Sequence, residues 1–316
     1  MSSRIHPAVE RIRAEHGHSV IELLEAGLSG ADLTSLLLHV AEQRASALSA
    51  TDVLAQRERD RFVQPALVDG RHMMRTELRA LDSIAELFDV LTLSPLCPLG
   101  THSVVAGVHQ NRVITTARST EVAADPTNGL ALEAALRRRD LMRASPRSAE
   151  LVRLACVQRV TRAQHFSGPM SYAHFSLLAM VIAGRDIGSS TFERTALVAL
   201  ASQMATVVRV AGADATSVTF TDFDGRHAEL LRDVAGTLAG NGIDVLSDHE
   251  RAAGHGYYPS VCFKVHARFG ESMIEVGDGG LVPWTQRLLG NSKERLLIGG
   301  IGLDRLAIHN TSVNPR

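Results

Sequence analysis

Two stretches rich in apolar and β-branched residues, 151–164 and 174–184, stand close together in the chain. Gly168 and Pro169 mark a turn between them, so the pattern predicts two strands joined by a loop. Three similar stretches follow in the last third of the chain, at 257–269, 272–282 and 295–307. Strands grouped in this way, with helices elsewhere, predict an α+β fold with an antiparallel-looking sheet rather than a doubly wound one.

Apolar residues at helical spacing predict helices in four places, namely 1–85, 125–142, 191–212 and 226–242. The first region continues its pattern through 75–91. The second begins with Thr127 or Asn128 as the expected N-cap, and its charged run at 137–140 is interpreted as a solvated helix end.

Shorter strands are predicted at 90–100, 103–122 and 217–224. From this order we expect an N-terminal helical region over residues 1–88 and a core over 89–316. The core is expected to contain a helical insertion at about 188–245.

Composition argues against several classes of function. Thirty-three Lys and Arg residues against 34 Asp and Glu give a formal net charge of −1, which disfavours a protein that binds nucleic acid over a wide surface. Cys97, Cys156 and Cys262 lie far apart without a CxxC pair, so neither a disulfide framework nor a Cys-rich zinc site is expected. No HxH or HExxH spacing relates His102, His109, His165, His174, His255 and His266, and no GxSxG or P-loop motif is present. Without a secretory signal or an 18-residue apolar run, we expect a soluble cytoplasmic protein.

Arginines occupy alternate positions of the strand predicted at 151–164. Arg153, Arg159 and Thr161 share one face of it, with Val157 between them. Buried arginine is rare unless it is paired, and guanidinium groups match planar oxyanions. This face is therefore either a phosphate or carboxylate clamp or the site of two ordinary salt bridges, and spacing alone does not choose between them.

Two glycine-rich segments could bring a ligand close to the backbone. Residues 299–306 read GGIGLDRL, and glycines at a strand end let a helix or a ligand approach the sheet. This is not the dinucleotide fingerprint, because Arg305 stands where a third small residue belongs. The second segment is EVGDGG at 275–280, in which Glu275 and Asp278 lie three residues apart. These two acids could hold Mg²⁺ or an ammonium group, and a plain turn explains them equally well.

Taken in order, these segments resemble the catalytic core of class II aminoacyl-tRNA synthetases, and within that class histidyl-tRNA synthetase. The resemblance covers roughly residues 90–310. VQRVTRAQ (157–164) followed by AHFSLLAMV (173–181) resembles the second motif of the class, a strand, a loop and a returning strand. The other matching segments are DPTNG (125–129), GHGYYPSVCFKVH (254–266), EVGDGGLV (275–282) and GIGLDRL (300–306), the last resembling the third motif.

The resemblance implies an ATP site next to an amino-acid site. Arg159 would contact the α-phosphate and the substrate carboxylate, while Phe175 and Arg305 would enclose adenine. The implied ATP site comprises Arg159, Thr161, His174, Phe175, Gly300, Gly302 and Arg305, with Arg159 and Arg305 as the catalytic residues. The implied amino-acid site comprises Asp125, Thr127, Tyr257, Tyr258, Glu275 and Asp278, with Glu275 also a candidate ligand of Mg²⁺. For the two tyrosines, core packing is an equally good interpretation.

Three departures from the family pattern bear on activity. Thr161 stands where the second motif has an acid two residues after its arginine. Ala253 replaces the arginine that stands four residues before the tyrosine pair, and the nearest arginine is Arg251. Only 11 residues follow Arg305 in this sequence, so we expect no anticodon-binding domain after the third motif and do not expect tRNA as a partner.

Three functions remain open. The first, which we favour, is a stand-alone ligase that uses ATP and Mg²⁺ to activate an amino acid or similar small carboxylic acid, and transfers it to a carrier-protein thiol, an amine or another small metabolite. The second is a non-catalytic amino-acid sensor, similar to the regulatory subunit of ATP phosphoribosyltransferase. The third is a synthetase variant whose N-terminal helices hold RNA. The resemblance also implies a homodimer formed through the first motif, near Pro95.

Overall fold

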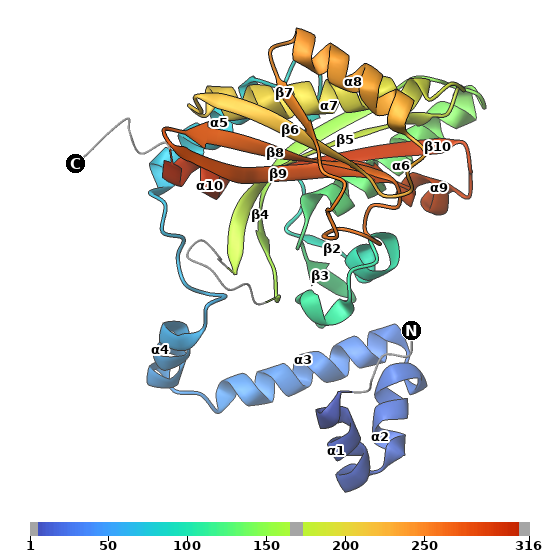
Figure 1. Ribbon diagram of the computed structural model, residues 1–316. Helices are drawn as coiled ribbons and strands as arrows, with labels where there is room; N and C mark the ends of the chain where they lie inside the picture. Colours follow the sequence, from blue (N-terminus) through green and yellow to red (C-terminus); the bar gives the residue numbers. More distant parts are fainter. Residues whose placement is uncertain (1–5, 165–172, 310–316) are drawn as a thin grey trace. The chain divides into compact units, whose positions relative to one another are not determined.

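The computed structural model describes residues 6–164 and 173–309. Contacts divide the chain into two compact units, which we treat separately (Figure 1). Residues 1–64 with 115–120 are called the helical unit, and residues 65–114 with 121–316 are called the sheet unit. No helix in the described part of the chain is long and apolar enough to cross a bilayer.

An eight-stranded sheet organises the sheet unit (Figure 1). Its strands run in the order β1–β4–β5–β10–β9–β8–β6–β7, and neighbours are antiparallel except for β1–β4 and β6–β7. The strands are β1 (Asp89–Val90), β4 (Val152–Thr161), β5 (His174–Arg185), β10 (Glu294–Gly302), β9 (Ser272–Val282), β8 (Val261–Phe269), β6 (Ala215–Asp222) and β7 (Asp244–Ser247). The predicted α+β class with a largely antiparallel sheet is confirmed.

Helices cover both faces of this sheet. One face, here called the α7 face, packs against α5 (Gly70–Asp82), α7 (Thr191–Val210), α8 (Ala228–Gly240) and α10 (Leu303–His309). The opposite face, called the α6 face, packs against α6 (Pro126–Ala144) and α9 (Trp284–Leu289). Side chains alternate along each strand, so Leu154 and Cys156 of β4 lie on the α6 face and Ala155 lies on the α7 face.

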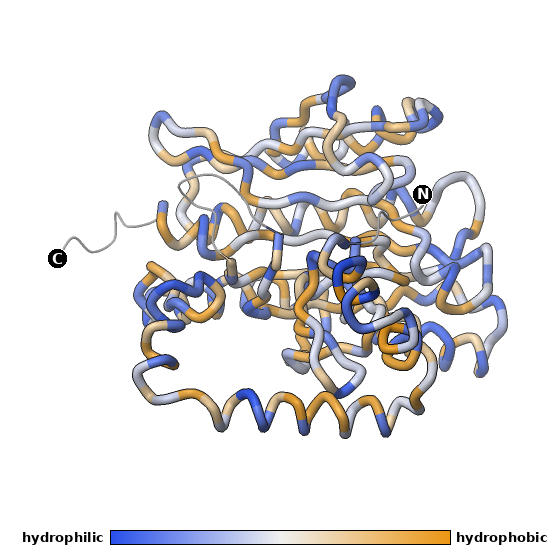
Figure 2. The backbone as a smooth tube through the Cα atoms, turned by 90° about the horizontal axis from the view of Figure 1, so that it is seen from below, coloured by the Kyte–Doolittle hydropathy of each residue, from blue (hydrophilic) through white to orange (hydrophobic). Residues whose placement is uncertain are grey.

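The helical unit contains α1 (Pro7–His16), α2 (His18–Glu22), η1 (Leu23–Gly27), α3 (Gly30–Ser46) and α4 (Ala50–Arg59). Local hydrogen bonds begin two of these helices. The Ser29 hydroxyl accepts from Asp32 N at 3.1 Å, and Ser49 and Asp52 form a reciprocal capping box. None of the described residues in these helices is buried, although Figure 2 shows a run of hydrophobic residues along α3. Capping and periodicity, rather than a core, therefore account for these helices.

The segment before α6 differs most from the prediction. The strands expected at 90–100 and 103–122 reduce to β2 (Leu96–Pro98) and β3 (Thr120–Val122), which pair separately from the main sheet. The cause is the Glu121 carboxylate, which accepts hydrogen bonds from the backbone N–H groups of Gly100 at 3.3 Å and His102 at 2.8 Å. Because these backbone N–H groups donate to a side chain, they are not available to pair with a neighbouring strand. The chain forms a turn over 101–105 instead.

Two element ends also differ from the prediction. The helix expected through 75–91 ends at Asp82, and the chain then turns into β1. At the start of α6, Asp125 Oδ1 accepts from Thr127 N at 2.9 Å, so Asp125 is the N-cap in place of Thr127 or Asn128.

The expected organisation into domains stays a prediction. Helix α5, which precedes the boundary expected at residue 88, packs within the sheet unit against α7 and α10. Residues 188–245, expected as a helical insertion, hold α7 and α8 and also β6 and β7, which extend the sheet. The turn predicted at Gly168 and Pro169 lies outside the described residues.

A buried ion pair joins α6 to the sheet. Arg138 Nε and Nη2 donate to the two carboxylate oxygens of Glu294 at 2.8 and 2.9 Å, and both side chains are fully buried. The same guanidinium donates to the carbonyl oxygens of Glu150 and Ser148. The interpretation of residues 137–140 as a solvated helix end is therefore wrong for Arg138.

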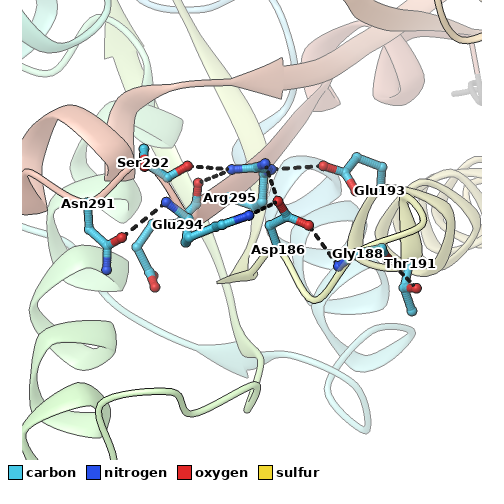
Figure 3. A network of polar contacts seen from close by, with 9 residues as sticks. Asp186, Gly188, Thr191, Glu193, Asn291, Ser292, Glu294 and Arg295 are labelled. Carbon is cyan, nitrogen blue, oxygen red and sulfur yellow. Dashed lines mark hydrogen bonds and ion pairs between the residues drawn. The ribbon is translucent and has the colours of Figure 1, made fainter.

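A second polar network ties the turn after β5 to the start of β10 (Figure 3). Arg295 donates to Glu193 Oε1 and to Asp186 Oδ2, each at 2.9 Å. Lys293 Nζ also donates to Asp186 Oδ2, at 3.1 Å. These contacts brace a turn in which residues 189 and 190, both serine, have φ values of 53° and 51°.

Replacing Arg138 by methionine should lower the free energy of unfolding by about 3–5 kcal/mol, because Glu294 would stay buried without its partner. The matched change Arg139→Met, at an exposed position of the same helix, should change it by less than about 0.5 kcal/mol. Urea unfolding followed by circular dichroism measures both values. Equal losses in the two variants would contradict the role assigned to the pair.

Packing explains one glycine of the EVGDGGLV segment. A Cβ built at Gly279 of β9 would lie 2.5 Å from Ile298 O and 2.6 Å from Phe263 Cζ. Both separations are shorter than real Cβ contacts, so neither a strand neighbour nor a core ring leaves room for a side chain. This glycine serves the sheet itself.

The variant Gly279→Ala should lose about 1–3 kcal/mol of unfolding free energy through overpacking. The matched variant Gly236→Ala lies in α8, where a Cβ would meet nothing within 4 Å among the described residues. It should gain roughly 0.4–1 kcal/mol because alanine reduces the entropy of the unfolded chain. Urea unfolding measures the change in unfolding free energy of each variant. Changes of opposite sign support this assignment, and a loss of stability in both variants contradicts it.

Candidate functional site

Two glycines near the end of β10 leave part of the α6 face without side chains. Gly300 pairs with Asp278 of β9, and Gly302 pairs with Leu177 of β5. Among the described residues, a Cβ at Gly300 would meet a single carbonyl oxygen within 4 Å, at 3.6 Å. We call this surface the glycine floor. A flat ligand group can lie directly against the backbone there.

Two arginines border the glycine floor. Arg305 Nη1 donates to Glu275 O at 2.8 Å, and its Cδ lies 3.8 Å from where a Cβ of Gly302 would be. Arg162, which follows β4, places its guanidinium carbon 5.0 Å from the centroid of the Phe175 ring. That separation lies within cation–π range. An aromatic ring and two cations therefore surround the floor.

Arg162 also joins the end of β4 to the start of α6. Its Nη2 lies 3.3 Å from Asp125 Oδ2, and its Nε donates to Ala124 O at 2.9 Å. The other Asp125 oxygen accepts from Thr127 N at 2.9 Å and from Thr127 Oγ1 at 2.7 Å. The DPTNG loop thus lies beside the arginine and the ring described above.

The paired tyrosines lie on the same face. Tyr257 contacts both Tyr258 and Trp284 edge to face, with ring centroids 4.9 and 5.6 Å apart. Tyr258 packs over Gly280, where a Cβ would lie 2.5 Å from its ring, and its hydroxyl donates to Asp278 Oδ2 at 3.4 Å. Burial raises the pKa of both tyrosines well above the usual value, so both stay neutral. Tyr258 serves the core with its ring and faces the site with its hydroxyl.

Arg251 reaches Asp278 from the segment before the tyrosine pair. Its side chain is only 4% exposed, and its Nη2 lies 3.6 Å from Asp278 Oδ2. Its Nε donates to Ala253 O at 2.8 Å, whereas its Nη1 has no hydrogen-bond partner among the described residues. A buried guanidinium with an unused donor is suited to an anionic ligand group. The sequence pattern alone did not predict this contact.

Glu275, the candidate ligand of Mg²⁺, is already paired. Lys264 Nζ lies 2.8 Å from Glu275 Oε2. The structure therefore presents an ion pair at this position rather than an available carboxylate.

The structure places Arg159 on the opposite face of the sheet from Phe175. Its Nη2 donates to Asp304 Oδ1 at 3.1 Å, and its Nη1 lies 2.9 Å from His174 Nδ1. Asp304 is almost fully buried and also accepts from Ser176 N at 2.6 Å. Arg159 and His174 are thus held in a network on the α7 face and are not brought together with Phe175 or Asp278.

Strand alternation accounts for this difference. Across β4 and β5, Thr161 pairs with His174 and Val160 pairs with Phe175. Thr161 therefore shares the face of Arg159 and His174, and Phe175 shares the face of Val160 and of the next even position, Arg162. Arg162 was not among the predicted site residues. The alternation rule already separated Arg159 from even-numbered positions, but the register between the strands was needed to place Phe175.

Several solved structures have the same fold as this chain. An ATP phosphoribosyltransferase regulatory subunit/histidyl-tRNA synthetase from Bacillus halodurans is 14% identical, with a TM-score of 0.58 over 76% of this chain and 80% of that chain. Histidyl-tRNA synthetase from S. aureus is 13% identical, with a TM-score of 0.59 over 80% and 70%. A histidine–tRNA ligase subunit from Alicyclobacillus acidocaldarius is 11% identical, with a TM-score of 0.59 over 79% and 96%.

The chain therefore has the fold of the class II aminoacyl-tRNA synthetase catalytic core. No protein-family model and no curated protein sequence matches the chain. Identity this low establishes the fold, and the function has to be argued from the residues of the site.

Replacing Asp278 by asparagine should stabilise the protein at neutral pH. Burial raises the pKa of Asp278 above its ordinary 3.8, with Arg251 opposing and Asp125 adding to the shift. The folded state then binds this proton more tightly than the unfolded state, so stability falls as the pH rises from 3.8 through the raised value. Thermal unfolding across acidic to neutral pH should show an advantage for Asp278→Asn that shrinks toward pH 3.8. A less stable variant at neutral pH would refute the argument.

Proposed function

We propose that the chain is an ATP-dependent ligase that activates the carboxylate of an amino acid, or of a similar small acid, as an acyl-adenylate. The observation that carries the proposal is a pair of arginine–acid contacts, Arg162 with Asp125 and Arg251 with Asp278. Burial raises the pKa of Tyr257, and the charges of both acids add to that shift. Paired positive and negative groups around one position suit a ligand that is itself zwitterionic.

The nucleotide would occupy the glycine floor. Phe175 and Arg305 offer an aromatic face and a guanidinium for adenine, and the backbone at Gly300 and Gly302 leaves room for a flat ring. Arg162 lies next to Phe175 and would meet the α-phosphate, the role that the resemblance implied for Arg159. This reassignment follows from the face on which each arginine lies.

The acid to be activated would bind beside α6. Asp125 and Thr127 would accept its ammonium group, with Asp278, which contacts Tyr258 and Arg251, as a further acid. The unused Nη1 of Arg251 would hold its carboxylate. Arg251 thereby supplies the guanidinium that is missing at Ala253.

Activation would proceed by in-line displacement. A carboxylate oxygen attacks the α-phosphorus of ATP, the bond from that phosphorus to the bridging oxygen breaks, and pyrophosphate leaves with the electron pair. Arg162 and Arg251 would neutralise the charge that gathers on the phosphoryl oxygens, so no protein nucleophile is needed. The Glu275 carboxylate is paired with Lys264 and does not fit the role of a Mg²⁺ ligand.

The proposal also covers the acceptor of the activated acyl group and the oligomeric state of the protein. The near-balanced charge of the chain supports an acceptor other than tRNA, such as a carrier-protein thiol or a small amine. A homodimer is proposed by analogy with the fold.

An amino-acid sensor without catalysis is the second candidate. The second motif of the class has an acid two residues after its arginine. In this chain Thr161 stands two residues after Arg159, and Gln164 stands two residues after Arg162, so an acid is missing in both cases, which favours the sensor. It is also favoured by the regulatory-subunit name of one protein of the same fold. A sensor needs the contacts around Asp125 and Asp278 and has no need of the glycine floor.

Pyrophosphate release, measured with ATP, Mg²⁺, each of the twenty amino acids and hydroxylamine as a trap, tests the ligase. We expect hydroxamate from one or a few acids. Arg162→Ala should lower its rate by about 10²–10³-fold, the loss typical when one charge-stabilising donor is removed. Arg159→Ala is the matched variant on the opposite face of the sheet. It should lower the free energy of unfolding and leave the rate of hydroxamate formation largely unchanged.

Three results would change this assignment. Loss of hydroxamate in Arg159→Ala but not in Arg162→Ala would return the phosphate role to Arg159. Thermal stabilisation by one amino acid without turnover would establish the sensor. A shift in mobility on addition of total tRNA would revive an RNA-binding synthetase variant.

A further inference from the structure

A cysteine, a histidine and a glutamate meet beside the small sheet formed by β2 and β3, which Figure 1 shows separate from the main sheet. Cys97 lies on β2, His102 lies in the turn that follows, and Glu121 lies on β3. One ligand-type atom from each lies within 4.8 Å of the other two. His102 and Glu121 are buried, while Cys97 is half-buried and gives access from solvent.

The histidine is already held in the state that a metal ion requires. Ala124 N donates to His102 Nε2 at 3.1 Å, so Nε2 carries a lone pair and the proton is on Nδ1. That Nδ1 lies 2.8 Å from Asn128 Oδ1, a buried amide oxygen that accepts its proton. A carbonyl acceptor behind the ring is the usual arrangement for a metal-binding histidine, because it fixes the tautomer and the ring orientation.

Hydrogen bonds hold the Glu121 carboxylate in the same place. Gln110 Nε2 donates to its Oε2 at 2.8 Å, and the backbone N–H groups of Gly100 and His102 donate to its two oxygens at 3.3 and 2.8 Å. Its Oε1 accepts a single one of these bonds, from His102 N at 2.8 Å, so a lone pair remains for a cation.

The separation of the two softer ligands matches a tetrahedral centre. Cys97 Sγ lies 3.5 Å from His102 Nε2. Zinc bonds of about 2.3 Å to sulfur and about 2.0 Å to nitrogen, at a tetrahedral angle, also place these atoms about 3.5 Å apart. The geometry points to a binding site for one divalent cation of the zinc class, held by Cys97, His102 and Glu121 with a fourth position open to solvent or an external ligand.

Charge balance favours this occupant. On binding, the Cys97 thiol gives its proton to solvent and the sulfur becomes a thiolate ligand. One thiolate, one carboxylate and a divalent cation sum to zero, so the loaded site buries no net charge. Thiolate and imidazole together select zinc over magnesium or calcium.

Binding carries one local consequence. The cation takes the Nε2 lone pair that Ala124 N–H now uses, so this amide must move aside. Ala124 immediately precedes Asp125, the N-cap of α6. Occupancy of the cluster is therefore linked to the loop that borders the candidate functional site.

One other described cluster offers metal ligands, but it carries no such inference. Asp222 ends β6, and Asp224 and His227 lie on the loop that follows, where Asp224 is exposed. The backbone of that loop already occupies its carboxylates, since Asp222 accepts from Gly225 N and His227 N. This second cluster therefore provides the control variant for the experiment below.

The test is titration of the full-length, chelator-stripped protein with Zn²⁺ against a chromogenic chelator, and with Co²⁺ as a spectroscopic substitute. We expect one ion per chain and a near-ultraviolet band from a sulfur–cobalt bond. Cys97→Ser and Glu121→Gln should each weaken Zn²⁺ binding by more than about 100-fold, since loss of a partner behind a ligand already costs about 10–100-fold. Asp224→Asn and Cys156→Ala, which remove a ligand of the other cluster and an unrelated buried thiol, should leave it unchanged.

Three results would overturn the proposal. The first is wild-type protein that takes up no Zn²⁺. The second is Cys97→Ser that binds as tightly as wild type. The third is a Co²⁺ complex without the sulfur band, which decides the matter in wild-type protein even where a variant fails to fold. Loss of binding in Asp224→Asn would move the site to the other cluster.

Discussion

The glycines of β9 and β10 set how closely the centre of the sheet can be approached from either side. On the α7 face, a Cβ at Gly299 would lie 2.9 Å from Met204 Sδ, so the core closes over bare backbone. On the α6 face, Gly300 and Gly302 leave the backbone uncovered by described side chains except for the stem of Arg305. Because β10 is paired on both sides, one strand determines both the packing of α7 and the space for a ligand.

Strand alternation then decides which charges can act together. Arg159 and Arg162 stand three positions apart, an odd separation, and their side chains lie on opposite faces of the sheet. The first is neutralised by buried Asp304, and the second lies beside Asp125 and Phe175. Both arginines are paired with an acid, but Asp304 is almost fully buried, whereas Asp125 is partly exposed and lies beside the arginine that stacks on Phe175.

The segment that begins α6 connects the two places where ligands are proposed. Asp125 accepts from Thr127 and pairs with Arg162 at the candidate functional site, while Ala124 N and Asn128 Oδ1 contact the two ring nitrogens of His102. Successive residues at a helix start point in different directions, so one short segment serves both sites. This arrangement explains why the strands predicted before residue 122 are replaced by turns: their backbone donors and side chains are committed to this cluster.

The sequence by itself determined the elements whose signal is local. Apolar periodicity predicted β4, β5, β9, α7 and α8, and the order of strands and helices predicted the α+β class. It also indicated most of the segments that border the floor, since Asp125, Phe175, Asp278 and Arg305 belong to motifs a few residues long. Only the tertiary structure decided which face each side chain occupies, because one residue of strand register moves a side chain to the other side of a sheet. For the same reason the contacts of Arg162, of Arg251 and of Cys97 with His102 and Glu121 required the fold, which brings together groups that no sequence spacing relates.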